Sequence, residues 1–283
     1  MRPVGLVATD LDGTLLDRET YDFAPARPAL DALRERGVPL VLVSSKTRAE
    51  MEPLAEAIAA TGPLVVENGG AVVARKGAVA AWPPWGRAEK DRVVLVLGVT
   101  RDRLLKELPH VARKAGVEVR PFAAMSVAEV AALTGLPEEQ AALAMKREYD
   151  EPFVVEGRPQ RDPDVDARLD RAARGRGLRV THGGRVHHLT GLADKGQAVR
   201  ALVHGWPGGV AGDVVGLGDA ANDLELLLAV DRPIVMPRPD GSVEPVLAGR
   251  LRGKERAPAP GPSGWAAAVL AALAGERLPR VGA

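Results

Sequence analysis

Residues 6–14, LVATDLDGT, form an apolar run that ends in two aspartates separated by one residue. The run at 4–9 is short and rich in aliphatic residues, which predicts a buried β-strand. Gly13 then breaks the strand, so Asp10 and Asp12 lie where the chain turns across the end of a sheet. Two carboxylates in such a place can act as a nucleophile and a proton donor, although an isolated DxDGT also fits a turn or a helix N-cap.

The sequence that follows this stretch alternates between amphipathic and apolar segments. We expect helices at 28–36 and 47–60, each stopped by a glycine, and strands at 39–43 and 64–66. This βαβαβ alternation with fully apolar strands predicts a parallel sheet covered by helices on both faces. Because ligands of such sheets bind at the carboxyl ends of the strands, polar residues at those ends are the candidates for a site.

A differently organised segment interrupts this alternation. The sequence PPWG at 83–86 predicts a boundary. A capping box of Ser126 and Glu129 opens one helical segment beyond it. The other elements expected in the segment are strands at 93–99, 118–122, 153–156, 178–182 and 185–190 and helices at 100–115 and 163–174.

The parallel pattern then returns, with strands at 214–218 and 233–236 and helices at 195–204, 222–230 and 264–275. We read the stretch before the last helix as a loop. The predicted fold class is therefore α/β, with a doubly wound parallel-sheet (Rossmann-like) core at 1–84 and 191–283 and an inserted α+β domain at 85–190. Hinges are expected near the two crossings, at 83–87 and 190–193.

Composition limits the possible partners. Lysine and arginine together number 38 and aspartate and glutamate 37, so no net positive field attracts nucleic acid or an anionic membrane. The arginine-rich helix near 163–176 has interleaved aspartates and no aromatic residue, which favours a solvated helix. The absence of cysteine excludes disulfides, thiolate metal sites and cysteine nucleophiles. We therefore expect a small-molecule partner, and a monomer and a dimer fit the sequence equally well.

Two apolar runs bear on location. The run at 4–8 is too short for the core of a signal peptide, which favours a cytoplasmic protein. The run at 265–274 is about half of the roughly 20 residues that a membrane span requires. The excess of arginine over lysine and the 23 prolines are typical of proteins from hot environments, although a GC-rich genome gives part of the same bias.

Polar residues also stand at two other element ends. Ser44 and Ser45 follow the second strand, where a hydroxyl and the amides of the next helix can hold a phosphate oxygen. A serine or threonine there is equally a helix N-cap. Lys195 opens the first helix after the insertion, where its charge can neutralise a bound phosphate, although a lone lysine is usually exposed.

The sequence GLGDAAND at 216–223 ends the fourth strand of the core and contributes three polar side chains within five residues. Asp219 or Asp223 facing Asp10 can complete an oxygen-ligated Mg²⁺ site. The stretch is a poor dinucleotide fingerprint, because it lacks the third glycine and continues into an acidic turn.

In chain order, DxDGT, the strand-end serine, the helix-opening lysine and GDxxND resemble the four motifs of the haloacid dehalogenase superfamily of phosphatases. The insertion between the second and third motifs is similar to the subgroup with a large α+β cap, and the resemblance covers essentially the whole chain. It implies that Asp10 becomes an aspartyl-phosphate and that Asp12 is the general acid and base. It also implies that Ser44 and Lys195 hold the phosphate.

The resemblance further implies Mg²⁺ as the cofactor. The ligands would be Asp10, the backbone carbonyl of Asp12 and Asp219, with Asp223 as a further ligand or directly behind them.

Three stretches are similar to those of a narrower group, the mannosyl-3-phosphoglycerate phosphatases: SSKT at 44–47, REYDEPF at 147–153 and HGGRVHHL at 182–189. This resemblance implies hydrolysis of a phosphorylated glycoside to the osmolyte mannosylglycerate. The alternative substrates are glucosyl-3-phosphoglycerate, sucrose phosphate and trehalose phosphate, and a phosphohexomutase is an alternative enzyme of the same fold. A protein that only binds a nucleotide or a partner is the non-enzymatic alternative.

A substrate with a phosphate, a carboxylate and sugar hydroxyls needs cations and bidentate polar groups in its pocket. We expect Lys46 and Arg147 to bind the carboxylate, although Arg147 and Glu148 also fit a surface ion pair. The other expected substrate contacts are Asn68, Gly69, Gly70, Glu148, Arg185, His187, His188 and Asn222.

The hairpin at 182–189 contains three of the five histidines. Strand alternation places Arg185 and His187 on one face and Val186 and His188 on the other, so the adjacent histidines cannot both point into one metal site. We expect one face to look onto Asp10, with either His188 or the pair of Arg185 and His187 contacting the glycerate or the sugar.

Overall fold

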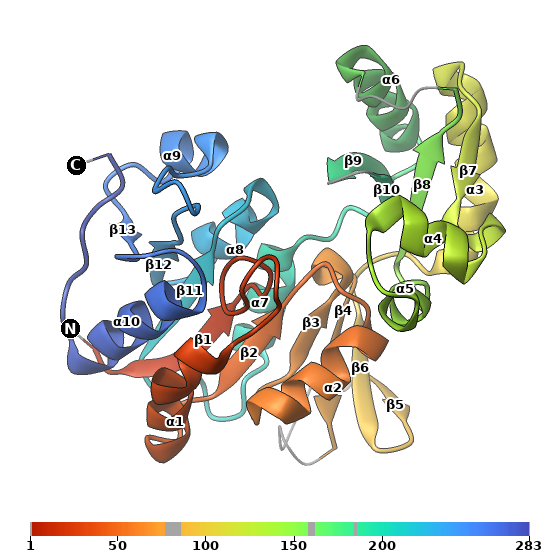
Figure 1. Ribbon diagram of the computed structural model, residues 1–283. Coiled ribbons are helices and arrows are strands. Elements are labelled where there is room, and N and C mark those ends of the chain that lie inside the picture. Colours follow the sequence, from red (N-terminus) through yellow and green to blue (C-terminus); the bar gives the residue numbers. More distant parts are fainter. Residues whose placement is uncertain (1, 77–85, 158–161, 184–185, 283) are drawn as a thin grey trace.

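The computed structural model describes residues 2–76, 86–157, 162–183 and 186–282. In this part of the chain the strands form two sheets, a large one of nine strands and a small one of four, which belong to two units (Figure 1). The large sheet has the order β13-β12-β11-β1-β2-β3-β4-β6-β5. Its strands are β1 (Val4–Thr9), β2 (Leu40–Val43), β3 (Leu64–Val66), β4 (Ala71–Arg75), β5 (Arg87–Glu89), β6 (Arg92–Val96), β11 (Asp213–Gly218), β12 (Arg232–Val235) and β13 (Glu255–Arg256).

The six strands from β13 to β3 pair in parallel, and β4, β6 and β5 continue the sheet antiparallel. The parallel part confirms the predicted core. The structure moves the first boundary of the insertion, because β5 and β6, which we expected in the inserted domain at 85–190, pair with the core. Short turns join β3 to β4 and β5 to β6, and strands joined in this way pair antiparallel. The pairing of β4 with β6 then attaches the second pair to the sheet. Residues 83–85 of the expected hinge lie outside the described residues.

Helices cover both faces of the large sheet because apolar side chains alternate along each strand. Val7 of β1 packs in a cluster with α1, α2 and α10, whereas Leu6 and Ala8 pack on the opposite face with α7 and α8. The helices of this unit are α1 (Arg27–Glu35), α2 (Arg48–Ile58), α7 (Lys195–His204), α8 (Leu224–Leu228), α9 (Pro245–Arg250) and α10 (Gly261–Ala274). The reading of the stretch before the last helix as a loop was wrong, since α9 and β13 form there.

The small sheet has the order β7-β8-β10-β9 and is antiparallel throughout. It has helices on both faces: α3 and α6 share one apolar cluster with Phe153, and α4 and α5 share another with Val186. Its elements are α3 (Arg101–Ala115), β7 (Val119–Pro121), α4 (Val127–Thr134), α5 (Glu138–Ala144), β8 (Asp150–Val155), α6 (Pro163–Arg174), β9 (Arg179–Gly183) and β10 (Val186–Thr190). We call residues 99–190 the inserted unit.

The two chain crossings between the units lie in contact. A Cβ atom on Gly191, in the returning segment, would lie 3.1 Å from the backbone nitrogen of Val99 in the outgoing segment. A Cβ on Gly98 would lie 3.0 Å from Cα of Gly70. The missing side chains therefore let both crossings pass close to each other and to the turn after β3.

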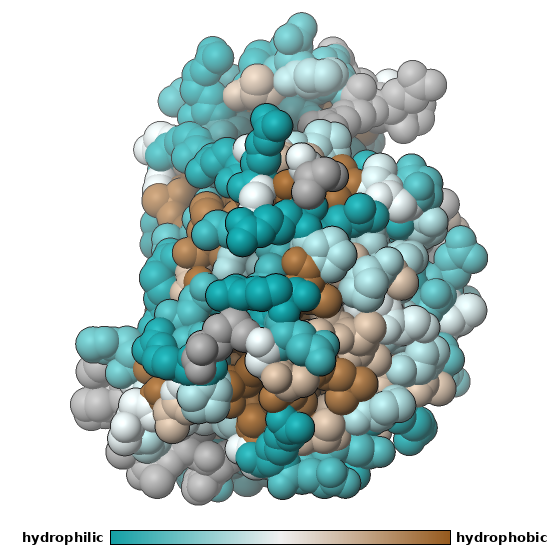
Figure 2. All heavy atoms as spheres, turned by 90° about the vertical axis from the view of Figure 1, so that its left-hand side faces the viewer, coloured by the Kyte–Doolittle hydropathy of each residue, from teal (hydrophilic) through white to brown (hydrophobic). Residues whose placement is uncertain are grey.

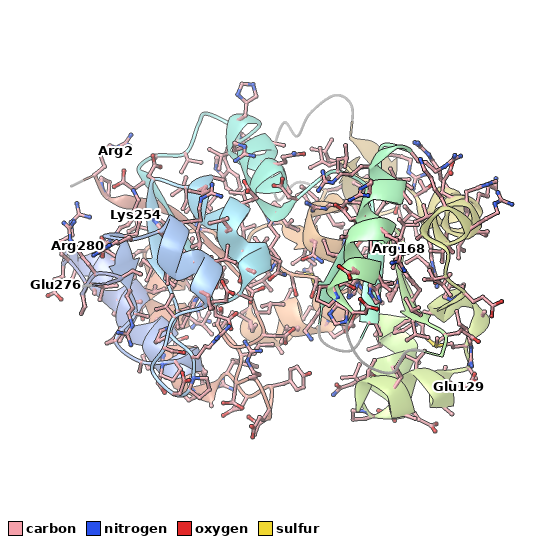
Figure 3. The ribbon with its side chains drawn as sticks, turned by 90° about the horizontal axis from the view of Figure 1, so that it is seen from above. Arg2, Glu129, Arg168, Lys254, Glu276 and Arg280 are labelled. Carbon is pink, nitrogen blue, oxygen red and sulfur yellow. The ribbon has the colours of Figure 1, made fainter. Side chains whose placement is uncertain are left out.

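Charged side chains surround both units (Figure 3). Arg168 of the arginine-rich helix α6, labelled there, donates to the carbonyl of Ala115 at 3.0 Å, and Arg174 pairs with Asp170 at 2.7 Å. Contacts within the inserted unit thus account for two of the arginines that raised the question of nucleic acid.

On the face shown in Figure 2, next to the C-terminal elements, hydrophilic and hydrophobic residues are mixed. Across the described ranges, none of the helices has the length and apolar character to cross a membrane.

Candidate active site

The predicted nucleophile Asp10 lies at the carboxyl end of β1, the central position of the parallel sheet, and is buried. Its Oδ1 accepts a hydrogen bond from Nζ of Lys195 at 2.6 Å, and the same Nζ donates to Oδ1 of Asp223 at 2.6 Å. Lys195 is the first residue of α7 and only 1% exposed. Asp10 and Lys195, 185 positions apart in the sequence, therefore form a buried ion pair. The alternative that Lys195 is an exposed surface lysine was wrong.

Burial raises the pKa of Asp10 to about 8, and the negative charge of Asp223 adds to that rise, while Lys195 opposes it. Burial alone would lower the pKa of Lys195, but the carboxylates of Asp10 and Asp223 outweigh it and raise the pKa above its ordinary value. The ammonium of Lys195 therefore stays charged and partly neutralises a cluster that contains more negative than positive charge.

Asp10, Asp219 and Asp223 form a buried carboxylate cluster. One oxygen of each lies within 4.8 Å of the others. Oδ2 of Asp223 accepts from the backbone amides of Asp219 and Ala220, both at 3.0 Å, so this carboxylate fixes the turn after β11. Oδ1 of Asp219 is buried and has no hydrogen-bond partner in the part of the chain that the structure describes. Oxygen atoms in such an arrangement could bind a metal ion, because hard cations take carboxylate ligands and would satisfy the unpartnered atom.

Arg18, in the loop after β1, contacts Oδ2 of Asp219. Its side chain is 57% exposed whereas that of Asp219 is 4% exposed. The guanidinium therefore reaches from the surface to the carboxylate cluster. Burial raises the pKa of Asp219, and the nearby Asp223 raises it further, while Arg18 lowers it.

Asp12, the predicted general acid and base, lies just beyond the end of β1. Its Oδ2 is 3.1 Å from Nζ of Lys46, and its Oδ1 is buried without a hydrogen-bond partner. Nζ of Lys46 also lies 4.8 Å from the ring centroid of Tyr21. Lys46 is thus at the site, as expected, and faces Asp12 directly.

Ser44 and Thr47 have different roles after β2. Thr47 is the N-cap of α2, and its side chain forms a capping box with Glu50. Ser44 is buried, and its Oγ accepts from the amide of Lys46 at 3.2 Å. Because Thr47 caps the helix, the alternative that Ser44 is an ordinary N-cap does not hold.

Arg147 is buried at the start of β8 and does not present a free guanidinium. Its Nη1 donates to the carbonyl of Ser45 at 2.7 Å and contacts Asp150 at 3.2 Å, and its Nε donates to the carbonyl of Ala144 at 2.9 Å. The prediction that Arg147 binds a substrate carboxylate is thereby weakened, because these donors already hold the inserted unit against the core.

Asn68 and Asn222 meet across the site. Nδ2 of Asn222 donates to Oδ1 of Asn68 at 3.0 Å. The adjacent glycines are closely packed, since a Cβ on Gly69 would lie 2.2 Å from the carbonyl oxygen of Asp194 and one on Gly70 would lie 2.5 Å from Cβ of Tyr149. The glycines thus allow the close approach of neighbouring chain segments, and their contact with substrate stays a prediction.

The two adjacent histidines point to opposite faces of the small sheet, as strand alternation requires. His187 stacks on Phe153 with ring centroids 5.2 Å apart, and its Nε2 lies 2.8 Å from Asp166 of α6. The suggestion that His187 faces the core site was wrong, because this face of the sheet packs on α3 and α6. Nδ1 of His188 lies 2.7 Å from Oδ2 of Asp150. Arg185 lies outside the described residues.

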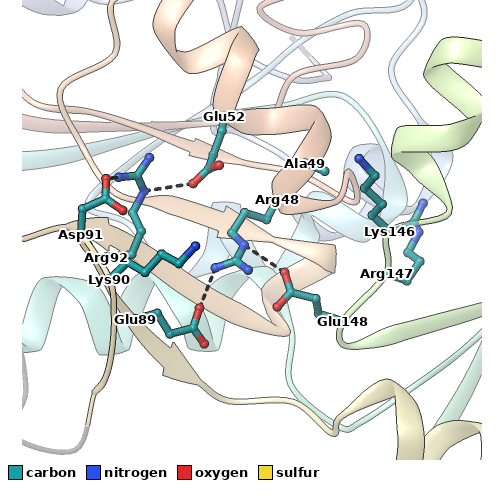
Figure 4. A pocket seen from close by; sticks show the side chains of 10 residues that line it. All are labelled: Arg48, Ala49, Glu52, Glu89, Lys90, Asp91, Arg92, Lys146, Arg147 and Glu148. Atoms are coloured by element: carbon teal, nitrogen blue, oxygen red, sulfur yellow. Dashed lines mark hydrogen bonds and ion pairs between the residues drawn. The ribbon is translucent and has the colours of Figure 1, made fainter.

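A charged cavity of about 870 Å³ lies beside the N-terminus of α2, between the core and the start of β8. Figure 4 shows Arg48 between two carboxylates, Glu89 at 2.9 Å and Glu148 at 3.0 Å. Glu148, predicted as a substrate contact, thus forms an ion pair between the units. Arg92, at the other end of the cavity, pairs with Glu52 at 3.0 Å.

Two residues near the site were missed at the level of sequence. Glu67, directly after β3, is 2% exposed and accepts hydrogen bonds from the backbone amides of Glu148 and Tyr149. The signal for it was an acidic residue at a strand end, next to the asparagine that we did single out. Arg18 gave no signal, because its contact with Asp219 spans 201 residues.

Comparison with known proteins gives the class of this fold and site. The family model of haloacid dehalogenase-like hydrolases matches residues 7–82, which contain the first two motifs. A solved haloacid dehalogenase-like hydrolase from Bacteroides thetaiotaomicron has the same fold, with a TM-score of 0.64 and 18% identity over 95% of this chain and 98% of that one. The molecule shares this fold, an α/β core with an inserted α+β unit.

Two curated relatives are more similar in sequence. A glucosyl-3-phosphoglycerate/mannosyl-3-phosphoglycerate phosphatase from Methanococcoides burtonii is 36% identical over 94% of this chain and 96% of its own length. A protein of the same name from Persephonella marina is 35% identical over 92% and 94%. The chain belongs to this family of phosphatases, and it is accordingly a phosphoric monoester hydrolase.

Proposed function

We propose that the protein hydrolyses mannosyl-3-phosphoglycerate to mannosylglycerate and phosphate through an aspartyl-phosphate on Asp10, and that it also accepts glucosyl-3-phosphoglycerate. The observation that carries the proposal is the buried pairing of Asp10 with Lys195 at 2.6 Å at the end of the central strand. The names of the two relatives, each of which includes both substrates, support the choice of substrate.

In the first half of the reaction, the carboxylate oxygen of Asp10 that Lys195 does not contact attacks phosphorus. A carboxylate and a phosphate repel each other, and the charged Lys195 offsets that repulsion at the point of attack. As the P–O bond to the glycerate breaks, Asp12 donates a proton to the departing oxygen. This role of Asp12 is supported by its Oδ1, which has no hydrogen-bond partner among the described residues.

In the second half, Asp12 takes a proton from water, and the resulting hydroxide attacks the phosphorus of the aspartyl-phosphate. Inorganic phosphate leaves and the carboxylate of Asp10 is restored. Ser44, buried at the end of β2, is proposed to donate its hydroxyl hydrogen to a phosphate oxygen. The bonds broken and formed balance as the addition of one water to one phosphoester.

The carboxylate cluster fits the divalent cation that this mechanism calls for. Oxygen donors in a buried site are the ligands that Mg²⁺ prefers, and Asp219 supplies an oxygen that has no other partner. Asp10 and Asp219 would bind the ion together with the backbone carbonyl of Asp12. Asp223 would hold the ligands in position without binding the ion itself, since its oxygens already bind Lys195 and two amides. When bound, Mg²⁺ supplies positive charge that offsets the charge on the phosphoryl group.

The inserted unit is proposed to act as a cap that closes over the substrate. Lys46 is a candidate for recognising the substrate because it faces Asp12 at the site. His188 is a second candidate because it lies on the opposite face of the small sheet from His187, which packs with Phe153 and Asp166. We further propose a role in compatible-solute synthesis, on the basis of the proposed product, mannosylglycerate.

The test is phosphate release by the purified protein with Mg²⁺ across a panel of substrates. We expect mannosyl- and glucosyl-3-phosphoglycerate to be hydrolysed fastest, with sucrose phosphate and trehalose phosphate far slower. Rapid hydrolysis of the disaccharide phosphates with none of either phosphoglycerate would overturn the substrate assignment. Interconversion of hexose phosphates without net phosphate release would indicate a mutase instead.

A further inference from the structure

Glu67 is a buried acid that the proposed mechanism does not use. It follows β3, has a left-handed backbone with φ of 48°, and is 2% exposed. A residue other than glycine with a left-handed backbone costs free energy, and so does a buried carboxylate. Both costs persist only where the surrounding structure requires them, so the contacts of Glu67 merit a functional explanation.

The two oxygens of Glu67 bind two successive amides of the inserted unit. Oε1 accepts from the amide of Glu148 and Oε2 accepts from the amide of Tyr149, both at 2.9 Å. Burial raises the pKa of Glu67 to about 7, although Arg147 and the two amides lower it. The carboxylate of Glu67 thus binds the backbone at the two residues that precede β8.

Glu148 and Tyr149 are followed in the chain by Asp150, which contacts His188, a candidate for substrate recognition. Asp150, the first residue of β8, is fully buried, and its Oδ2 contacts both Nδ1 of His188 at 2.7 Å and Nη1 of Arg147 at 3.2 Å. Arg147 in turn donates to the carbonyl of Ser45 at 2.7 Å, next to the phosphate-binding candidate Ser44. Residues 147–150 therefore connect the turns after β2 and β3 to His188.

Further contacts hold the same junction. Oγ1 of Thr47, the N-cap of α2, donates to the carbonyl of Leu143 at 3.0 Å. Arg48 pairs with Glu148 at 3.0 Å beside the cavity of Figure 4. This junction is a third attachment between the units, in addition to the two chain crossings.

We propose that Glu67 is a positioning residue: its carboxylate fixes the start of β8 on the core and thereby sets the location of Asp150 and His188 over the active site. The expected effect on substrate rests on the proposed function. The attachment of residues 148 and 149 to Glu67 does not. Because each carboxylate oxygen accepts one amide, a carboxamide at this position loses one acceptor and turns an NH₂ group toward an amide hydrogen.

The first test is steady-state kinetics of Glu67→Gln at pH 8 with two substrates. For mannosyl-3-phosphoglycerate we expect kcat/KM to fall about tenfold, the effect of one buried hydrogen bond, mainly through KM. For p-nitrophenyl phosphate, which has no sugar or glycerate, we expect little change, because Asp10, Asp12 and Lys195 are untouched. An equal loss with both substrates would overturn the positioning role and indicate general damage to the fold.

The matched control is Glu52→Gln. Glu52 is an acid of α2 that pairs with Arg92 of the core strand β6 at 3.0 Å. It should retain the parent kinetics with both substrates. A loss of the same size in Glu52→Gln would show that removal of any charge near α2 suffices, which contradicts the proposal.

The second test is amide hydrogen exchange, which needs no substrate and so separates the joint from the proposed function. In the parent protein the amides of Glu148 and Tyr149 should exchange slowly, and in Glu67→Gln at least tenfold faster, with exchange in β1 unchanged. Rapid exchange of both amides in the parent protein would overturn the proposal even if Glu67→Gln cannot be purified. If the parent hydrolyses neither phosphoglycerate but protects both amides, the proposed function fails and the joint stands.

Discussion

Trp265 of α10 donates its indole hydrogen to Oγ1 of Thr9 at 2.9 Å, and Thr9 in turn donates to the backbone carbonyl of Asp10 at 2.8 Å. Both side chains are fully buried. The last helix of the chain therefore has a polar contact with the strand that carries the nucleophile, in addition to its apolar packing on that face of the sheet.

This relationship predicts a stability effect for Trp265→Phe. The substitution keeps an aromatic ring but removes the donor and leaves a small cavity, so unfolding in urea should become easier by between about 1 and 3 kcal/mol. Leu270→Ala on the exposed side of α10 is the control and should change stability far less, since its side chain is 39% exposed. Equal effects of the two substitutions would contradict a specific role of the hydrogen bond and its buried ring.

Replacement of the proposed nucleophile should abolish turnover. Asp10→Asn keeps the shape of the side chain but cannot form the aspartyl-phosphate, and we expect kcat to fall by a factor on the order of 10³ or more. Asp31→Asn on α1, where the side chain is 54% exposed, should have the parent rate. Phosphate release from mannosyl-3-phosphoglycerate measures both, and a folded Asp10→Asn protein with the parent rate would exclude covalent catalysis at this residue.

Arg18 is expected to compete with a cation for Asp219. The guanidinium contacts Oδ2 of Asp219, so Arg18→Gln should tighten binding of Mg²⁺ by roughly two- to fivefold, the value of a partly exposed ion pair. Isothermal titration with MgCl₂ in the absence of substrate measures this directly. Arg34→Gln, which removes an exposed arginine of α1, should leave the affinity unchanged. Weaker binding in Arg18→Gln would show that Arg18 orients the carboxylate for the ion.

The raised pKa of Glu67 predicts a pH-dependent contribution to stability. The ordinary value is 4.5 and the folded value is about 7, so as the pH rises through this interval the unfolded chain releases its proton before the folded one does. The contribution of Glu67 to folding is therefore fully present below about pH 4.5 and is lost by about pH 7. The charged groups facing Glu67 are Arg147 and Asp150.

Urea unfolding of the parent and of Glu67→Gln between pH 5 and 8 tests this linkage. The free energy of unfolding of the parent, relative to that of the variant, should decrease as the pH rises to about 7 and then level off. A difference that stays constant over this range would show that Glu67 keeps its ordinary pKa in the folded protein.

The adjacent histidines should respond differently to replacement. His188→Ala should raise KM for mannosyl-3-phosphoglycerate about tenfold while hydrolysis of p-nitrophenyl phosphate persists, because a charge-assisted hydrogen bond to substrate would be lost. His187→Ala should leave KM unchanged and destabilise the protein by about 1 to 3 kcal/mol, through loss of the contacts with Phe153 and Asp166. The reverse assignment of effects would place His187 in the site.

Local sequence patterns predicted the parallel core well. Each strand end that carries Asp10, Ser44 or Asp219 follows a continuous apolar run, and the three runs pair in parallel with β1 in the middle. The topology of parallel strands then brings the ends together without any information about distant contacts. Assigning the capping role to Thr47 or to Ser44, by contrast, required the backbone geometry, because both residue types stabilise helix N-termini.

Contacts between units could not be predicted in this way. The family resemblance led us to expect that Arg147 and Glu148 meet substrate. From the residues alone they also fit a surface ion pair, and neither pattern indicates which neighbouring surface covers them. Their actual partners, Ser45, Glu67 and Arg48, lie about a hundred residues or less away in the chain but belong to a different sheet. The boundary near residue 85 failed for a related reason, since the apolar run of β6 fits either sheet equally well.

The contact of Gly191 with Val99 has a consequence for how such a molecule can be assembled. The long segment between these residues leaves the core and returns to it at almost the same point. The core therefore needs only a very short connection between the two points, whatever the length of the segment. A chain whose two connection points already touch can accept an insertion of any length without spreading the surrounding strands. The core sheet and the inserted unit can therefore change separately. The core then keeps the reaction, while changes in the inserted unit alter which substrate is accepted.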